Sequence, residues 1–182
     1  MSLKPLALAL LFAAAPVYAA DYVNAPGSTL TFATKYQGEV FSGRLPGFTS
    51  RISFEPGQLS TAKLDVIIPL AGSDTKNTER DDTLKGTDFF AINKFPQARY
   101  TATKFRSMGA NNYAADGNLT LRGVTKPVTL NFTWTAGANP VLIGKATVKR
   151  LDFGVGGGDW ADTQIIPNEV AISTKLTLKP LP

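Results

Sequence analysis

Two pairs of carboxylates are the residues of this sequence whose types and spacing could do chemistry. Asp81 is followed by Asp82, and Asp159 lies close to Asp162. A glycosidase needs two acids on facing elements, whereas each of these pairs lies within one polar segment and fits a helix start or a loop. A hydrolase or isomerase built on one pair is the rival interpretation, and a strongly raised carboxylate pKa would favour it.

Histidine and cysteine are both absent from the sequence. Their absence removes Ser-His-Asp and Cys-His nucleophilic catalysis and the ordinary zinc sites. The Lys and Arg residues are scattered, although the net charge is +5, so no nucleic-acid-binding face is expected. The sequence therefore predicts no enzyme, with no catalytic residue, no metal and no catalytic cofactor.

A second set of charged residues suits binding better than catalysis. Arginine offers several fixed donors for a phosphate or a carbonyl oxygen. The competing interpretation is a set of exposed ion pairs, each worth about 0–1 kcal/mol. The candidates for contact with a ligand headgroup are Arg44, Arg80, Asp81, Asp88, Arg150 and Asp152.

Strands must position these residues, because apolar and polar residues alternate with period two along most of the chain. Each expected strand has one apolar and one polar face, which is typical of an antiparallel sheet with one wet side. Roughly eight such strands with short turns predict an all-β fold, either one closed barrel or a sandwich. The expected strands are 30–34, 51–54, 64–68, 100–105, 117–121, 128–134, 146–148 and 170–178.

One helix is expected, over about 76–85, with Leu84 as its only large apolar residue. Such a polar helix lies on the surface or across a barrel opening. Glycine clusters interrupt the pattern at 38–47 and 154–158, and the second indicates a loop at a barrel mouth. Residues 122–127 are expected to form a hairpin connection that keeps Pro127 away from the strand centre.

The N-terminus has the pattern of a cleaved signal peptide: Lys4, an apolar stretch over 6–15, and small residues up to Ala19. Residues 1–19 are therefore predicted to be removed after Ala19, and 20–182 to form one domain. No later apolar run is long enough to span a bilayer. A protein of the periplasm is expected.

Several motifs, taken in order, resemble the YceI family of periplasmic lipid- or polyisoprenoid-binding proteins. They lie at 42–56, 74–90, 117–128 and 150–154, with Lys94-Phe95-Pro96 between the second and third. The resemblance implies an eight-stranded, lipocalin-like antiparallel barrel with a short helix near one end. It also implies an apolar tunnel that holds an isoprenoid chain, such as a quinone tail or a polyprenyl group; some relatives hold fatty-acid derivatives.

The alternation by itself favours a solid core, whereas the resemblance favours a tunnel, since an eight-stranded barrel can be filled or can hold one slim ligand. Phe89, Phe90 and Phe95 could line an entry or close the barrel end, and Trp160 could stack on a ring or pack on the rim. The residues expected to line the tunnel are Phe32, Phe41, Phe48, Ile52, Phe54, Leu64, Val66, Ile68, Phe89, Phe90, Phe95, Leu119, Leu121, Val128, Leu130, Phe132, Val148, Phe153, Trp160, Ile172 and Leu176.

The resemblance thus implies a carrier that binds a ubiquinone-type or other long-chain lipid without catalysis. The glycine-rich loops at 38–47 and 154–160 lead to the hypothesis that they and the helix near Arg80 control entry. Residues 157–162 look like those of relatives associated with membrane di-haem cytochromes. Transient contact with such a cytochrome or with the membrane surface is therefore expected, and a homodimer is a further expectation. The alternative is a filled barrel that acts as a structural, interaction or stress-response module.

Overall fold

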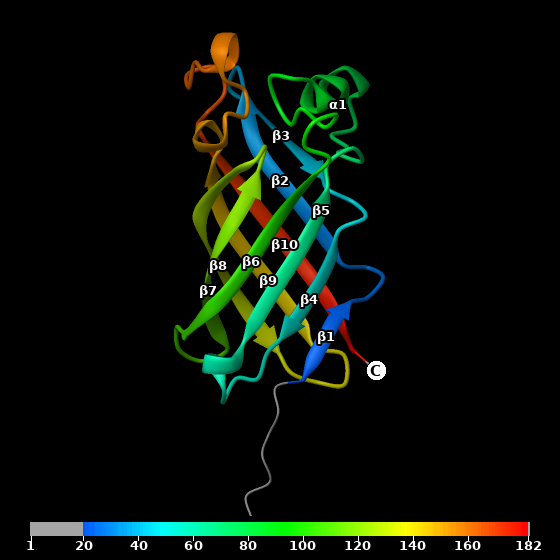
Figure 1. Cartoon of the computed structure of the whole chain (residues 1–182), viewed down its shortest axis with the longest axis vertical. Coiled ribbons are helices and arrows are strands. Elements are labelled where there is room, and N and C mark those ends of the chain that lie inside the picture. The colour runs from blue at the N-terminus through cyan, green and yellow to red at the C-terminus, as the bar shows by residue number, and fades with distance from the viewer. Residues whose placement is uncertain (1–19, 182) are drawn as a thin grey trace, which may run out of the picture.

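The structure is a computed structural model that describes residues 20–181 (Figure 1), so the predicted signal peptide at 1–19 lies outside the described residues. Within the described range the chain forms ten strands and one α-helix. The strands are β1 (Asp21–Asn24), β2 (Thr29–Tyr36), β3 (Glu39–Arg44), β4 (Thr49–Ser53), β5 (Lys63–Pro69), β6 (Gln97–Ser107), β7 (Asn112–Leu121), β8 (Val124–Thr135), β9 (Val141–Lys149) and β10 (Glu169–Pro180).

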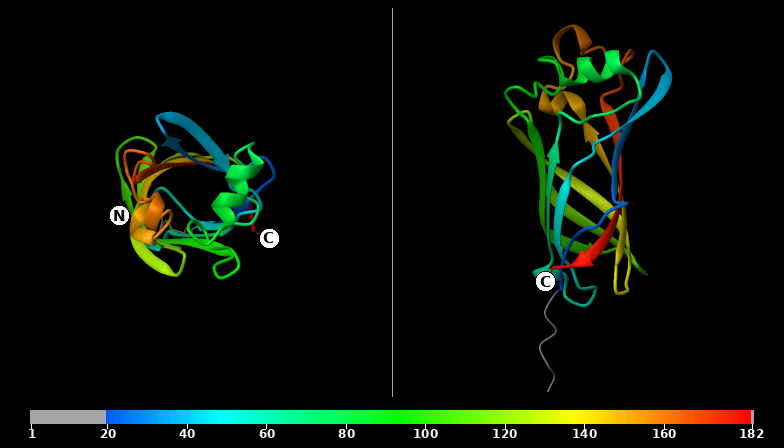
Figure 2. Two further views of the ribbon diagram at one scale, coloured as in Figure 1. Left: turned by 90° about the horizontal axis from the view of Figure 1, so that it is seen from above. Right: turned by 90° about the vertical axis from the view of Figure 1, so that its right-hand side faces the viewer.

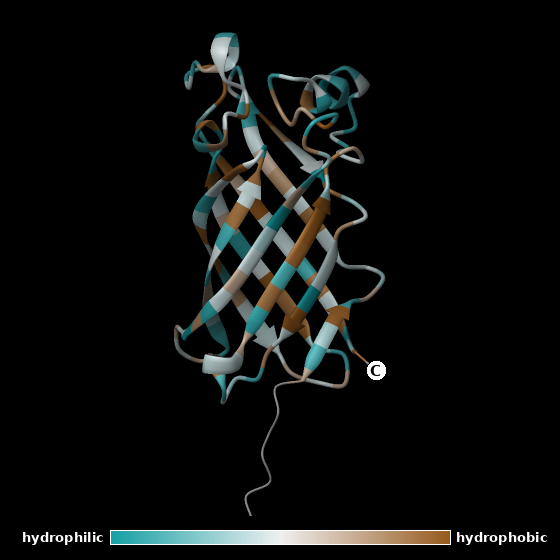
Figure 3. Ribbon diagram, viewed as in Figure 1, coloured by the Kyte–Doolittle hydropathy of each residue, from teal (hydrophilic) through white to brown (hydrophobic). Residues whose placement is uncertain are grey.

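All strand pairings are antiparallel, and eight strands close into a ring in the order β1-β4-β5-β6-β7-β8-β9-β10-β1. Strand β10 is long enough to pair with two strands along the same edge. Its residues 178–180 pair with β1, and its residues 171–175 pair with β2. The β2–β3 hairpin therefore extends the ring at the end that carries the helix, which is the upper end in Figure 1. The eight-stranded antiparallel barrel is confirmed. Apolar and polar residues alternate along its strands (Figure 3).

Two details of the strand prediction are wrong. Residues 39–44, expected to be part of a glycine-rich break, form β3, in which Gly43 faces inward beneath the ring of Phe32. Pro127 lies inside β8, opposite Asn118 of β7, and the hairpin connection is only Arg122-Gly123. Pro127 is tolerated because the β8–β9 ladder begins at Asn131, so its missing N–H faces an unpaired edge.

Helix α1 (Thr78–Lys85) lies over one side of the upper end of the barrel (Figure 2, left). Asn77 caps it, because its side chain accepts a hydrogen bond from the Arg80 N–H at 2.9 Å. Leu84 is its buried residue, as expected for a helix that is polar elsewhere. No helix in the described part of the chain is long and apolar enough to cross a membrane.

The lower part of the barrel interior is filled with aromatic side chains. The ring centroid of Phe54 lies 4.7–5.9 Å from those of four other rings, mostly edge-to-face or tilted. We call Phe54 and these four residues the aromatic cluster: Phe54, Phe105, Tyr113, Phe132 and Trp134.

Candidate functional site: an apolar cavity under the helix

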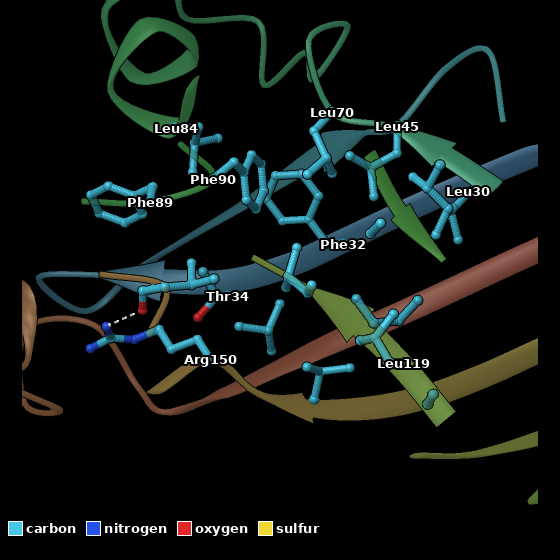
Figure 4. Close-up of a pocket in the computed structure, with 18 of the residues that line it drawn as sticks. Leu30, Phe32, Thr34, Leu45, Leu70, Leu84, Phe89, Phe90, Leu119 and Arg150 are labelled. Atoms are coloured by element: carbon cyan, nitrogen blue, oxygen red, sulfur yellow. Dashed lines mark hydrogen bonds between the residues drawn. The ribbon is translucent and has the colours of Figure 1, made fainter. Parts of the chain in front are cut away.

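The upper part of the barrel holds a cavity of about 470 Å³. Its wall is formed by inward-facing apolar side chains from β2, β3 and the strands β5 to β10, and α1 with its flanking segments covers it (Figure 4). Because the wall is almost entirely apolar, the cavity suits a hydrophobic guest.

The cavity ends at one level around the barrel. Tyr100 on β6, Leu130 on β8 and Leu176 on β10 are the deepest lining residues of their strands, and the next inward-facing residues belong to the filled part. Those next residues are Ala102, Phe132 and Leu178.

Inward-facing glycines allow this floor to form. A Cβ atom on Gly117 would lie 2.7 Å from the phenol of Tyr100, and one on Gly144 would lie 2.9 Å from Leu130. Each large side chain therefore lies flat across the neighbouring strand. The Tyr100 hydroxyl donates toward the carbonyls of Ala115 at 2.8 Å and Val128 at 3.1 Å, and burial raises its pKa, so the ring is fixed and neutral.

Arg80 of α1 is the cation that stands at the mouth of the cavity. Its guanidinium carbon lies 4.3 Å from the ring centroid of Phe41, and its Nε donates to the hydroxyl of Thr75 at 3.0 Å. Within residues 20–181 no carboxylate forms a salt bridge with it. Arg80 therefore keeps donors for an oxygen-bearing ligand group at this end.

Arg150 also lines the cavity but is almost fully buried, with 3% of its surface exposed. Its Nε donates to Pro167, Nη1 to Val155 and Gly156, and Nη2 to Trp160 and Ile166, all through backbone carbonyls. A guanidinium has five N–H donors, so all are used. Burial lowers the pKa of Arg150. Its role is to hold the loop between β9 and β10, and it has no donor left for a headgroup.

The other headgroup candidates do not face the cavity. Arg44 and Asp152 are exposed. The carboxylate of Asp81 accepts the N–H and hydroxyl of Thr75, both at 2.7 Å. Asp88 is exposed and accepts the Gly156 N–H through its backbone carbonyl at 2.7 Å. These four polar side chains take part in local structure or contact solvent, so of the six candidates only Arg80 and Arg150 lie on the cavity wall.

The carboxylate pairs are also used locally. Asp82 lies 3.4 Å from the ammonium group of Lys85, and the Asp162 carboxylate accepts the Gln164 N–H at 2.8 Å. Neither pair lies on the cavity wall.

Most of the residues predicted to line the tunnel do line the cavity. Five do not: Ile52, Phe54 and Phe132 lie in the filled lower end. Phe95 lies beside Gly123 of the β7–β8 turn, and Phe153 is buried but is not on the cavity wall. The alternation of apolar and polar residues shows which side chains face inward but not how deep in the barrel they lie, which explains the wrong prediction for Ile52, Phe54 and Phe132. The residues that line the cavity as predicted are Phe32, Phe41, Phe48, Leu64, Val66, Ile68, Phe89, Phe90, Leu119, Leu121, Val128, Leu130, Val148, Trp160, Ile172 and Leu176.

Sequence reasoning missed several lining residues. Leu30, Thr34 and Tyr36 continue the inward row of Phe32 on β2, so the alternation could have identified them. Tyr100 was expected in a strand but not on the cavity wall. The remaining missed residues come from the covering segments or are small: Leu45, Leu70, Asn77, Glu79, Thr83, Leu84, Ala98, Ala146, Val155, Ile166, Val170 and Thr174.

The glycine-rich segment after β9 has a defined geometry. Gly154, Gly156 and Gly158 all have positive φ, which side-chain-bearing residues rarely adopt. A Cβ on Gly156 would lie 3.1 Å from the ring of Phe89, whose centroid is 5.4 Å from that of Trp160. These glycines therefore allow the loop to pack against the segment after α1, and Phe89 and Trp160 together close part of the mouth.

The chain matches the YceI-like domain over residues 22–178, and it belongs to this family of antiparallel β-barrel proteins. A UPF0312 protein from Shewanella oneidensis is 31% identical over 157 residues, which cover 80% of this chain and 82% of that protein.

Solved structures share the fold, and two of them illustrate the range of identity. BcnA of Burkholderia cenocepacia has a TM-score of 0.79 at 29% identity, over 82% of this chain and 94% of its own. A polyisoprenoid binding domain from Saccharophagus degradans, implicated in plant cell wall breakdown, has a TM-score of 0.69 at 14% identity, over 90% of this chain and 100% of its own.

Proposed function

We propose that this protein binds an isoprenoid lipid and carries it without changing it chemically. The apolar tail, of a quinone or a polyprenyl compound, occupies the cavity, and the polar head lies at the mouth beside Arg80. The observation that carries this proposal is the apolar cavity of about 470 Å³ in a barrel whose interior could have been filled. The polyisoprenoid-binding name of the Saccharophagus degradans domain supports the ligand class.

The energetics fit a ligand that is held mainly by burial. A tail that buries a few hundred Å² at about 25 cal/mol per Å² gains roughly 10 kcal/mol before the cost of ordering the chain. No reactive side chain is needed for such binding, and Arg80 supplies a donor for a carbonyl or phosphate oxygen. A ubiquinone-type ligand is the compound that we expect.

The test is native mass spectrometry of the protein purified from a periplasmic extract, followed by organic extraction. The variant Val66→Trp places a large ring on the cavity wall and should shorten or remove the co-purifying lipid. Ile67→Trp is the matched control, because the neighbouring side chain points outward and is 36% exposed. A fatty-acid derivative in the extract would change the ligand class, and a protein that neither retains nor binds a prenyl lipid would contradict the proposal.

Periplasmic export belongs to the proposal and rests on the signal-like pattern of residues 1–19. The mature protein should begin at Ala20, which N-terminal sequencing of the periplasmic fraction would test. Accumulation of the uncleaved chain in the cytoplasm would oppose it.

Transient contact with a membrane surface, where lipid is exchanged, fits the upper end of the barrel. Tyr36, Val40 and Ile165 are exposed large apolar residues, and Val40 is 71% exposed. The Gln37 N–H donates to the Ile165 carbonyl at 2.9 Å, which brings the β2–β3 turn and the loop before β10 together. Val40→Asp should slow lipid transfer to vesicles without changing equilibrium binding. Contact with a membrane cytochrome and homodimerisation stay predictions from the family resemblance.

A further inference from the structure

The cavity is a blind pocket, because side chains of the barrel wall close its lower end. Tyr100 and Leu130 are the deepest lining residues of β6 and β8. The aromatic cluster lies beneath them, and its members Phe54 and Phe132 are buried. A chain that enters at the mouth therefore ends at this floor and cannot pass through the barrel.

The floor is held in place by contacts that a guest cannot easily displace. The Tyr100 hydroxyl donates to the carbonyls of Ala115 and Val128. Below it the rings of Tyr113 and Phe132 stack with their centroids 5.5 Å apart. Pushing the floor downward would break hydrogen bonds of buried groups and aromatic contacts together, so the depth of the cavity is a fixed property of the barrel.

Two inner rows of side chains measure this depth. The lining residues of β2 run from Leu30 to Tyr36, and those of β10 run from Leu176 to Val170. Figure 4 shows part of the β2 row, from Leu30 near the floor to Thr34. Each row covers six residue steps, or about 20 Å along a strand, and a tilt of about 40° leaves about 15 Å along the barrel axis. This depth takes roughly three extended isoprene units of about 5 Å each.

The volume of the cavity gives a second limit, which also holds for a folded chain. At the packing density of a protein interior, about 0.74, a cavity of about 470 Å³ holds roughly four isoprene units of about 80 Å³ each. The depth and the volume therefore agree on a short chain.

We propose that the cavity selects prenyl chains of three or four isoprene units, and that Tyr100 and Leu130 are the residues that set this limit. A chain of this length reaches the floor while its polar head lies at the mouth beside Arg80. A longer chain would hold its head beyond Arg80 or leave part of its tail in water. This inference rests on the proposed lipid-binding function and adds the length of the ligand.

The test is a series of prenols that differ only in length: farnesol with three units, geranylgeraniol with four and solanesol with nine. Each is offered to the delipidated protein from the same detergent micelles, and native mass spectrometry measures the bound fraction. Farnesol and geranylgeraniol should bind. Isoprene units outside the cavity exchange the micelle for water, so solanesol should bind more than about a hundredfold more weakly than geranylgeraniol.

Solanesol bound as tightly as geranylgeraniol would overturn the length limit and leave the proposed function intact. A wild-type protein that binds none of the three prenols would instead overturn the proposed function.

The variant Leu130→Ala tests the floor, because it removes about the volume of one isoprene unit there. The five-unit alcohol geranylfarnesol should gain about tenfold in affinity relative to geranylgeraniol. Leu121→Ala is the matched control, since Leu121 lines the same cavity at the upper end of β7. It should leave the ratio of the two affinities at the wild-type value. A ratio that stays constant in Leu130→Ala, or rises equally in both variants, would overturn the role of the floor.

Discussion

The lower and upper parts of this barrel differ in content, although the same strands form both. Below Tyr100 and Leu130 the interior is filled by the aromatic cluster, and Phe54 is only 1% exposed. Above them the same strands carry Leu, Val and Ile side chains that leave about 470 Å³ empty. The comparison shows that one alternating pattern can build a solid core and a binding cavity in a single barrel.

The difference lies in side-chain size and cover. Five aromatic rings reach across the lower interior, where Ala102 and Ala115 leave room for them. In the upper part the aromatic side chains lie on β2, β3 and the covering segments, whereas β5 and β7 to β10 present mainly aliphatic side chains that leave the middle open, and α1 with its neighbouring loops covers part of that end. The filled end therefore supplies rigidity, while the hollow end supplies the site.

Phe54→Ala should have the largest effect, because it empties the centre of the aromatic cluster. Truncation of a buried Phe to Ala typically costs about 3–5 kcal/mol. Denaturant unfolding monitored by circular dichroism measures the loss. Phe54→Leu should lose clearly less, and equal losses would show that packing around the ring does not determine the effect.

Leu178 and Leu176 form a matched pair on β10. Leu178 lies in the filled end and is 0% exposed, whereas Leu176 is 3% exposed and lines the cavity. Leu178→Ala should cost about 3–4 kcal/mol, within the range for a packed leucine.

Leu176→Ala should cost about 1–2 kcal/mol less in the lipid-free protein, because a side chain beside a void has already lost part of its contacts. Addition of lipid should narrow the gap between the two variants. Equal losses in the lipid-free protein would contradict a hollow upper barrel.

Replacing Ala115 or Ala146 by a larger residue tests the same contrast between the filled and the hollow part of the barrel. Ala115 is fully buried near the aromatic cluster, whereas Ala146 is half-buried on the cavity wall. Ala115→Leu should cost about 1–3 kcal/mol through overpacking. Ala146→Leu should cost less than about 1 kcal/mol and weaken prenyl-lipid binding, as thermal melts and lipid titrations would show. A large stability loss at Ala146 would indicate a filled wall.

The smallest effect is expected on the outer wall, where Arg99 lies 2.7 Å from Asp65 across β5 and β6. The hydrogen bond from Arg99 lowers the pKa of Asp65. A lowered folded-state pKa adds stability above the unfolded value of about 3.9, and this stability is lost as the pH falls through the folded pKa. Arg99→Gln should therefore lower the melting temperature slightly at neutral pH and by less at about pH 3, where part of the contribution is lost.

Arg51→Gln is the reference for that measurement, since its pair with Asp21 is long, at 4.0 Å. It should change the melting temperature by less than Arg99→Gln. A loss at about pH 3 as large as that at neutral pH would show that the Arg99 effect is not ionic.

Much of the fold could be predicted from the sequence because alternation is a local property. The inward rows of β5 and β8 are visible in the order of their residues, and the polar helix with its single Leu84 has only a surface position available. The inward role of Gly43 could not be predicted, because the ring that covers it belongs to another strand. The same is true of Pro127, whose tolerance depends on where β9 begins to pair.

The residues of the candidate site can also be divided into those that the sequence could predict and those that it could not. Residue types alone indicated an apolar interior and six charged candidates for a headgroup contact, of which only Arg80 and Arg150 line the cavity. Arg150 has a different role from the one its type suggests, because backbone carbonyls occupy every donor of its guanidinium. Hydrogen-bond partners come from distant segments, so residue type does not reveal them.

The sequence by itself determined the antiparallel strands, their inward faces and the lack of histidine-based catalysis, because each depends on composition or on the order of neighbouring residues. Only the tertiary structure decided how deep the cavity reaches. That depth depends on which side chains meet across the barrel, and Phe54 and Phe132 meet at the lower end while Val66 and Val148 stand on the wall of the cavity above.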